Sequence, residues 1–202
     1  MMKLTLPILT IAATIFAGSA FAFDPDDLQR LKDTGHCVAC DLSNVLHSSA
    51  DLQGANLTDA DLEGAYLRYA NLHYANLEGA VLSGAMLTMA SLWGAKLGGA
   101  DLSFANLEGA YLQDANLTDA KLEGAALHTA TLTNANLHGA KLEGADLSFA
   151  NLESAYLVGA NLKDADLSGA KLKDADLEGA YMNGAILCNT TMPDGSVIYS
   201  GC

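Results

Sequence analysis

The sequence predicts an all-β solenoid built from four-sided coils, with a short helical cap at its N-terminal end. Alanine recurs at every fifth position from Ala50 to Ala185, without a miss. A leucine stands two residues after each alanine, from Leu52 to Leu187, and Met182 is the one substitution. The result is 28 consecutive five-residue units of the form A-(N/D)-L-x-x. This period fits neither a helix nor a simple strand, and fixed self-similarity is typical of a solenoid.

The spacing within each unit predicts the shape of a coil. Alanine and leucine, two residues apart, point to the same side of an extended segment. The next such pair can point inward only if the chain turns in between, so each unit makes one side and one corner. Four sides close a coil, and the 28 units give seven coils. At about 4.8 Å for each coil, the stack is expected to be roughly 34 Å long.

The repeat also resembles a known family. Runs such as "ANLEGAYLQDANLTDAKLEGA" (residues 105–125) are similar to the pentapeptide-repeat family, whose members form right-handed quadrilateral β-helices. The resemblance extends from about Cys40 to Leu187. The repeats, together with the segments at both ends of the chain, resemble an exported bacterial subgroup of this family. The resemblance implies the fold but not the activity, because one fold hosts many functions.

The first 22 residues are typical of a secretory signal peptide. Lys3 precedes an apolar run that ends in small residues, and cleavage is expected after Ala22. A membrane anchor is the alternative, but the run is short and no stop-transfer flank follows it. We expect a periplasmic or secreted protein, with no membrane insertion of the mature chain.

Residues 23–36 are expected to form a helical cap. Asp24 suits the N-cap, Pro25 the first helical position, and Gly35 the stop. Leu28 and Leu31 share one face, which suits them to covering the open end of the first coil. The repeat domain is then expected over residues 37–188, and a C-terminal cap loop over residues 189–202. Caps are expected because exposed coil edges invite edge-to-edge pairing.

The four cysteines are expected to form disulfides, as is usual in an exported chain. In the phase of the repeat, Cys37 takes a leucine position and Cys40 an alanine position, so both should point inward across one corner. Cys188 and Cys202 should close a small loop. Alternatives are bonds between chains, a zinc site, or a redox dithiol. Attachment of haem is excluded because Asp41, rather than histidine, follows Cys40.

Two features depart from the repeat or suggest metal chemistry. A zinc site would join Cys37 and Cys40 to His36 and His47, but the spacing matches no common zinc module. In the unit "VLHSS", His47 stands where leucine belongs and Leu46 is displaced by one position. Either the chain bulges to admit Leu46 to the core, or the first coil is irregular beneath its cap. We expect no metal and no cofactor.

No catalytic constellation is expected. Glu123 and Glu143 should be close neighbours, because outward positions 20 residues apart lie one coil apart. However, none of the 28 units contains an insertion that could build a pocket wall. The later histidines, His73, His128 and His138, fall on different sides or coils. We therefore expect that the protein is not an enzyme.

An apolar patch on the early coils is the main candidate for recognition. It gathers outward aromatic and methionine side chains on two adjoining sides: Tyr66, Tyr69, Tyr74, Met86, Met89 and Trp93. Outward aromatics can simply be tolerated on flat walls. They can equally form a docking patch for a protein partner or for a second copy of the chain.

The charge narrows the range of partners. The chain has 24 acidic and 10 basic residues and a formal net charge of −14. Such a surface should repel nucleic acid. We therefore expect an exported, non-enzymatic structural or protein-interaction module. One alternative is an acidic DNA mimic acting on a topoisomerase, as in some family members, which export disfavours. The other is a metal- or redox-active periplasmic protein using Cys37 and Cys40.

Overall fold

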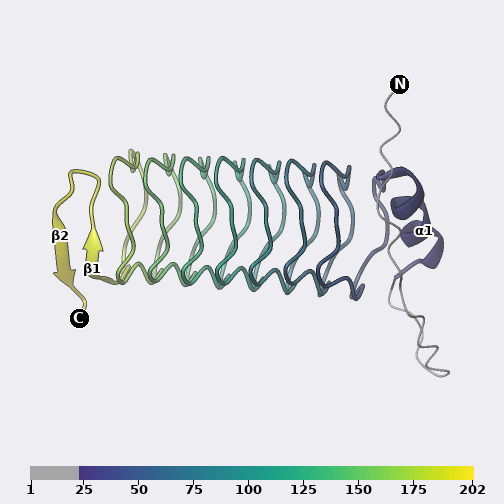
Figure 1. The fold of residues 1–202 in the computed structure, drawn as a ribbon. Helices are drawn as coiled ribbons and strands as arrows, with labels where there is room; N and C mark the ends of the chain where they lie inside the picture. The colour runs from purple at the N-terminus through teal and green to yellow at the C-terminus, as the bar shows by residue number, and fades with distance from the viewer. Residues whose placement is uncertain (1–22) are drawn as a thin grey trace.

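The computed structural model describes residues 23–202, and the predicted signal peptide lies outside them. The described residues contain one helix, α1 (Pro25–Thr34), and two short strands, β1 (Leu187–Thr191) and β2 (Val197–Ser200). Between α1 and β1 the chain runs as a row of stacked coils, with α1 at one end and the β1–β2 hairpin at the other (Figure 1).

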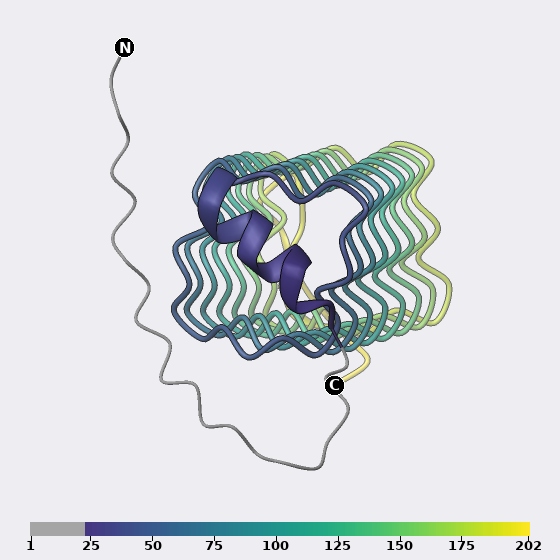
Figure 2. The ribbon, with the colours of Figure 1, turned by 90° about the vertical axis from the view of Figure 1, so that its right-hand side faces the viewer.

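The coils are joined by single parallel bridges instead of long strands. Every bridge pairs residues 20 positions apart, for example Asn76 with Lys96 and Ala126 with Asp146. The leucine N–H donates to the next coil, as from Leu97 to the Asn116 carbonyl at 2.7 Å. Seen along the stack, successive coils superpose into one four-sided outline (Figure 2). The step of 20 residues is the one expected from the five-residue period.

The core is formed by the alanines and leucines of the repeat. From Leu57 to Leu172, none of these side chains exposes more than 1% of its surface. The alanine N–H also closes each corner, as from Ala100 to the Leu97 carbonyl at 3.0 Å. The second corner residue takes a left-handed conformation, with φ between 51° and 77° throughout the coils. Such a conformation favours glycine, asparagine and aspartate.

Helix α1 lies across the open end of the first coil (Figure 2). Asp24 caps it by accepting a hydrogen bond from the Asp26 N–H at 2.9 Å, Pro25 begins it, and Gly35 ends it in the left-handed conformation. Leu28 and Leu31 are buried in the hydrophobic core. The predicted helical cap is therefore confirmed in its start, its end and its apolar face.

In the first coil, His47 and not Leu46 occupies the inward position of the unit "VLHSS". Leu46 points outward with 73% of its surface exposed, whereas His47 is 8% exposed and occupies the leucine position. Leu46 makes a regular bridge to Tyr66, and the His47 N–H donates to the Tyr66 carbonyl. A bulge that admits Leu46 to the core is therefore wrong, because the repeat keeps its register through this unit.

The C-terminal cap is a hairpin instead of the expected loop. Strands β1 and β2 pair in antiparallel fashion, from Leu187 opposite Ser200 to Thr191 opposite Val197. The predicted boundary after residue 188 falls inside β1. The reason is local sequence, since β-branched residues flank the turn that contains Gly195. The hairpin leaves inward side chains of the last coil partly exposed: Leu177, Ala180, Met182 and Ala185.

Candidate functional site

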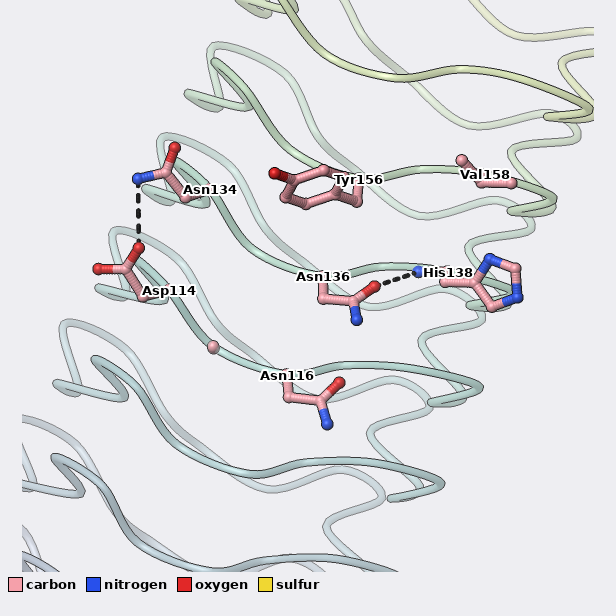
Figure 3. A pocket seen from close by; sticks show the side chains of 8 residues that line it. Asp114, Asn116, Asn134, Asn136, His138, Tyr156 and Val158 are labelled. Carbon is pink, nitrogen blue, oxygen red and sulfur yellow. Dashed lines mark hydrogen bonds between the residues drawn. The ribbon is translucent and has the colours of Figure 1, made fainter.

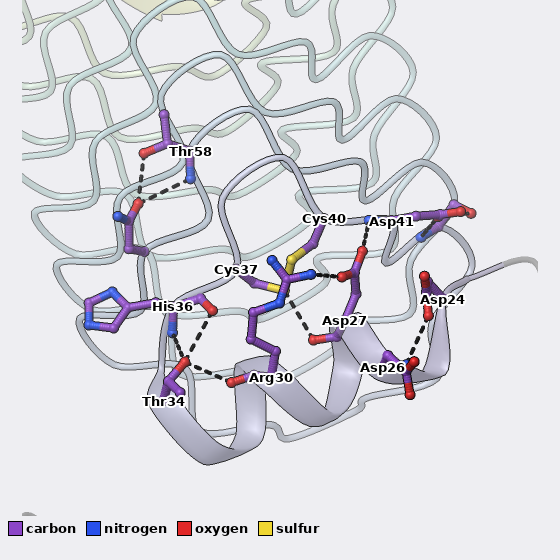
Figure 4. Close-up of a disulfide and its surroundings, with 12 residues drawn as sticks. Asp24, Asp26, Asp27, Arg30, Thr34, His36, Cys37, Cys40, Asp41 and Thr58 are labelled. Carbon is purple, nitrogen blue, oxygen red and sulfur yellow. Dashed lines mark hydrogen bonds and ion pairs between the residues drawn. A yellow bond between two sulfur atoms is a disulfide. The ribbon is translucent and has the colours of Figure 1, made fainter.

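The Cys37–Cys40 disulfide lies within the first coil, beside the helical cap. The two cysteines are bonded, with Cα atoms 5.3 Å apart, and both are buried. The Asp27 carbonyl oxygen lies 3.1 Å from the Cys37 Sγ. The Asp27 carboxylate accepts a hydrogen bond from the Asp41 N–H at 2.8 Å and pairs with Arg30 (Figure 4). Asp27 thus fixes α1 to the coil beside the disulfide.

The same geometry bears on whether the C-x-x-C forms a disulfide or a zinc site. Within the described residues, only Asp27 brings a further metal-ligating atom within 4.8 Å of the two sulfurs. His36 and His47, the other proposed zinc ligands, do not join this group. Burial of His47, followed by the nearby charge of Lys32, lowers its pKa, which favours the neutral imidazole in the core. These contacts fit a structural disulfide in the first coil, next to α1.

The second predicted disulfide, Cys188–Cys202, is also present, with Cα atoms 4.9 Å apart. It ties the C-terminal end to β1. Nearby, the Thr190 hydroxyl is fully buried and donates to the Leu167 carbonyl at 2.7 Å. The two disulfides therefore lie at opposite ends of the stack of coils.

The stacked carboxylates have partners that suit a structural role. Glu143 pairs with Lys163 at 2.5 Å, and this hydrogen bond and charge lower the glutamate pKa. Glu123 accepts a hydrogen bond from the Ser103 hydroxyl at 3.3 Å. A general acid in glycoside hydrolysis needs the opposite, a raised pKa. The pKa of Glu143 is therefore shifted in the opposite direction from that of such an acid.

Two of the later histidines, His73 and His128, form hydrogen bonds between coils. His73 bonds the Ser91 hydroxyl, and its ring meets Trp93 edge to face at 5.7 Å. His128 is 2.8 Å from the Ser148 hydroxyl. In each of these two cases the bond joins neighbouring coils.

The structure places one half of the apolar patch on one side of the coils and its adjoining corner. Tyr66 and Met86 are bridge partners on consecutive coils, and the exposed Leu46 extends this column by one coil. Tyr69 and Met89 occupy the following corner, 63% and 40% exposed. The sequence analysis missed Leu46, although the absence of asparagine or aspartate at its position could have indicated it.

The other half of the patch is held together by Trp93. Its ring lies 4.9 Å from the Tyr74 ring, and its Nε1 donates to the Asp114 carboxylate at 2.8 Å. The two halves are separated by the side of the coil that carries Asn71 and Ser91. The patch therefore spans two adjoining sides. Trp93 is held by Tyr74 on the preceding coil and by Asp114 on the following coil.

Exposed corner aromatics are seated on glycines of the next coil, a pattern that the sequence analysis missed. An ideal Cβ on Gly94, Gly124 or Gly169 would lie 2.7 Å from a ring atom of Tyr74, Phe104 or Phe149 respectively. In each case the glycine follows the aromatic residue by 20 positions, so a comparison of residues 20 apart in the sequence could have indicated this pairing.

The glycine pairing separates Tyr69 from the other corner residues of the patch. Met89 is seated in the same way on Gly109. Tyr69, however, is followed one coil later by Met89 instead of a glycine. Tyr74 and Met89 therefore pack on a glycine of the next coil, whereas Tyr69, the most exposed of the three, has no glycine there.

No helix within residues 23–202 has the length and apolar character needed to cross a membrane.

Comparison with known proteins identifies the repeat. A family model described as pentapeptide repeats matches residues 48–84, 75–114, 85–124, 110–148 and 145–184. No curated protein matches the sequence.

Several solved structures are similar to the chain. HetL, a pentapeptide repeat protein involved in heterocyst differentiation regulation in the cyanobacterium Nostoc sp. strain PCC 7120, is 28% identical over 85% of this chain and 98% of its own, with a TM-score of 0.33. A pentapeptide repeat protein from the thylakoid lumen of Arabidopsis thaliana is 34% identical over 49% and 69%, with a TM-score of 0.25. A variant of QnrB1, a plasmid-mediated fluoroquinolone resistance protein, is 19% identical over 82% and 86%, with a TM-score of 0.48.

Proposed function

The chain belongs to the pentapeptide-repeat family, and we propose that it is a non-enzymatic protein-interaction module on a right-handed quadrilateral β-helix. The observation that carries this proposal is the apolar patch of the early coils. Its most exposed aromatic side chain, Tyr69, exposes 63% of its surface and packs on no glycine of the next coil. Large rigid aromatic side chains of this kind dominate the binding energy of protein interfaces.

The charge of the chain supports a partner with a basic rim around an apolar contact. The net charge of −14 attracts a cationic partner and steers its approach. Binding is then expected to be faster at low salt, because screening weakens this attraction. The apolar contact itself should respond little to salt.

We further propose that the protein is exported to the periplasm or secreted. This proposal rests on the signal peptide expected over residues 1–22 and on the pairing of all four cysteines as disulfides, which persist in oxidising compartments. Cell fractionation with an antibody to the protein tests it. Accumulation in the cytoplasm would instead favour the DNA mimic that acts on a topoisomerase.

The interaction proposal is tested by removing the apolar side chains while keeping the corners. In the Tyr69→Asn Met89→Asn variant, asparagine suits both positions because Asn134 adopts the same left-handed corner, with φ of 58°. Phe149→Asn is the matched control, since Phe149 is exposed at the same corner of a later coil and is seated on Gly169.

The comparison uses immobilised wild type and variants to capture partners from periplasmic extract. The proposal expects one set of proteins to be retained by wild type and by Phe149→Asn and to be lost with the double variant. Equal retention by all three, with equal thermal stability, would refute it.

Self-association is a second candidate, favoured by the C-terminal end. Leu177 and Met182 are only partly buried there, whereas the corresponding leucines in the middle of the stack are fully buried. Covering this end with a second copy would remove apolar surface from water. Sedimentation at several concentrations tests it, and a monomer throughout would exclude it.

A further inference from the structure

Two shallow hollows meet at the corner formed by Asp114 and Asn134, beyond the patch proposed above. The first has a volume of about 400 Å³ and lies on the side that carries Asn116, Asn136 and Tyr156 (Figure 3). The second, of about 560 Å³, lies on the adjoining side. We call the two together the corner groove. Trp93 is the one residue that it shares with the patch.

The floor of the first hollow is a column of amides that ends in a ring. Asn116, Asn136 and Tyr156 are consecutive bridge partners, so their side chains stand one above another (Figure 3). Each asparagine Oδ1 is already used, accepting from the Thr118 or His138 N–H at 3.1 Å. Within residues 23–202, no hydrogen bond is made by the Nδ2 of Asn116 or Asn136. Both amides therefore present free donors beside the exposed ring of Tyr156.

The corner itself adds acceptors. The Asn134 Nδ2 donates to the Asp114 Oδ1 at 3.2 Å, and the Trp93 Nε1 donates to the Asp114 Oδ2 at 2.8 Å. These bonds fix the carboxylate and orient the Asn134 amide with its own oxygen unused among the described bonds. On the far side, Trp93 and Tyr111 offer partly exposed rings. Aromatic rings thus flank a strip of fixed donors and acceptors.

The residues and the shape of the corner groove disfavour anions and small apolar molecules as ligands. Among the described residues that line it, Asp114 is the one aspartate, glutamate, lysine or arginine, although the chain has a net charge of −14. Two histidines, His73 and His138, also line it. Both oxygens of the Asp114 carboxylate are engaged by neighbours. In the described part of the chain, the lining contains no lysine or arginine that could form an ion pair with an anionic ligand. The hollows are also too open to enclose a small apolar molecule, which needs a deep pocket.

We propose that the corner groove binds an uncharged oligosaccharide. Sugar rings have C–H faces that stack on aromatic side chains and hydroxyls that both donate and accept hydrogen bonds. Tyr156 and Trp93 supply the rings, the Asn116 and Asn136 amides supply donors, and Asn134 supplies an acceptor. A linear sugar laid across the corner meets these groups in turn without a closed pocket.

The test uses the intrinsic fluorescence of Trp93, the only tryptophan in the chain. Purified protein is titrated with cellotetraose, chitotetraose and maltotetraose, and with tetragalacturonate as the anionic comparison. The proposal expects a saturable change with at least one neutral tetrasaccharide and a much weaker response to the anion. No saturable binding of any neutral probe would overturn it, as would tighter binding of tetragalacturonate.

Variants locate the site and separate it from the interaction surface. Tyr156→Ala and Asn136→Ala are each expected to weaken binding roughly tenfold. Tyr181→Ala, which removes an exposed tyrosine outside the groove, should leave binding unchanged. The Tyr69→Asn Met89→Asn variant should keep sugar binding, and Tyr156→Ala should keep the protein partner. Equal affinity of wild type, Tyr156→Ala and Asn136→Ala would overturn the site. If Tyr156→Ala fails to fold, Asn136→Ala alone decides.

Discussion

The seating of corner aromatics on glycines predicts a difference between two chemically identical substitutions. Gly124 and Gly144 occupy the same corner of consecutive coils, with φ of 63° and 66°. An added Cβ at Gly124 would lie 2.7 Å and 2.8 Å from the Cε1 and Cδ1 of Phe104, whereas at Gly144 it would meet nothing within 4 Å. Gly124→Ala and Gly144→Ala therefore share the backbone strain but differ in the clash.

The size of the difference follows from these contacts. Alanine in the left-handed conformation costs each variant roughly 1–2 kcal/mol of stability. Gly124→Ala must also displace the Phe104 ring, which is 74% exposed and can rotate away into solvent. It then loses its packing on the next coil, which we estimate at about 1 kcal/mol. Gly124→Ala should therefore be the less stable variant by about that amount.

Urea unfolding followed by circular dichroism measures both variants, alone and with Phe104→Asn. Once the ring is removed, Gly124→Ala should destabilise the protein no more than Gly144→Ala does, which a double-mutant cycle detects. Equal losses with Phe104 present, or an excess loss that persists in the Phe104→Asn background, would refute the seating of the ring.

Three further predictions concern the caps and the core. Replacing Cys188 and Cys202 by serine opens a loop of 14 residues and should cost about 3 kcal/mol, measured by urea unfolding with and without reductant; no loss would show that the disulfide is dispensable. His47→Leu should remove a pH dependence: because the folded-state pKa of His47 is lowered, the wild type should lose stability as the pH falls below about 6.5 towards that lowered value, and the variant should lose less. Parallel pH profiles of the two would contradict this. Leu107→Ala, at a fully buried position, should cost about 2–5 kcal/mol in the same assay, and a loss under 1 kcal/mol would contradict close packing of the core.

The sequence was sufficient to predict the coils because every inward position obeys one period. Burial alternates with side-chain direction, so the phase of alanine and leucine alone determines which side chains enter the core. The same phase placed Cys37 and Cys40 inward, and the structure confirms their bond. It could not decide between the alternatives for His47, because the burial of a histidine depends on its surroundings in the folded chain and not on the period of the repeat.

The proposed interaction surface was harder to predict because the outward positions are occupied by more varied residues than the inward ones. Sequence spacing gathered Tyr69 and Tyr74 into one patch, yet only Tyr74 is seated on a glycine. That distinction could have been drawn by comparing residues 20 apart. The corner groove could not, since it depends on which amide atoms of Asn116 and Asn136 are used within the coil.

The most direct test of the proposed interaction surface is the dissociation constant of a captured partner, measured for wild type, Phe149→Asn and Tyr69→Asn Met89→Asn. Loss of exposed anchor side chains should weaken binding by roughly tenfold or more, while lowering the unfolding temperature no more than Phe149→Asn does. Wild type and Phe149→Asn should bind alike. If the double variant binds the partner as tightly as wild type does, Tyr69 and Met89 are surface features of the coils and not the binding site.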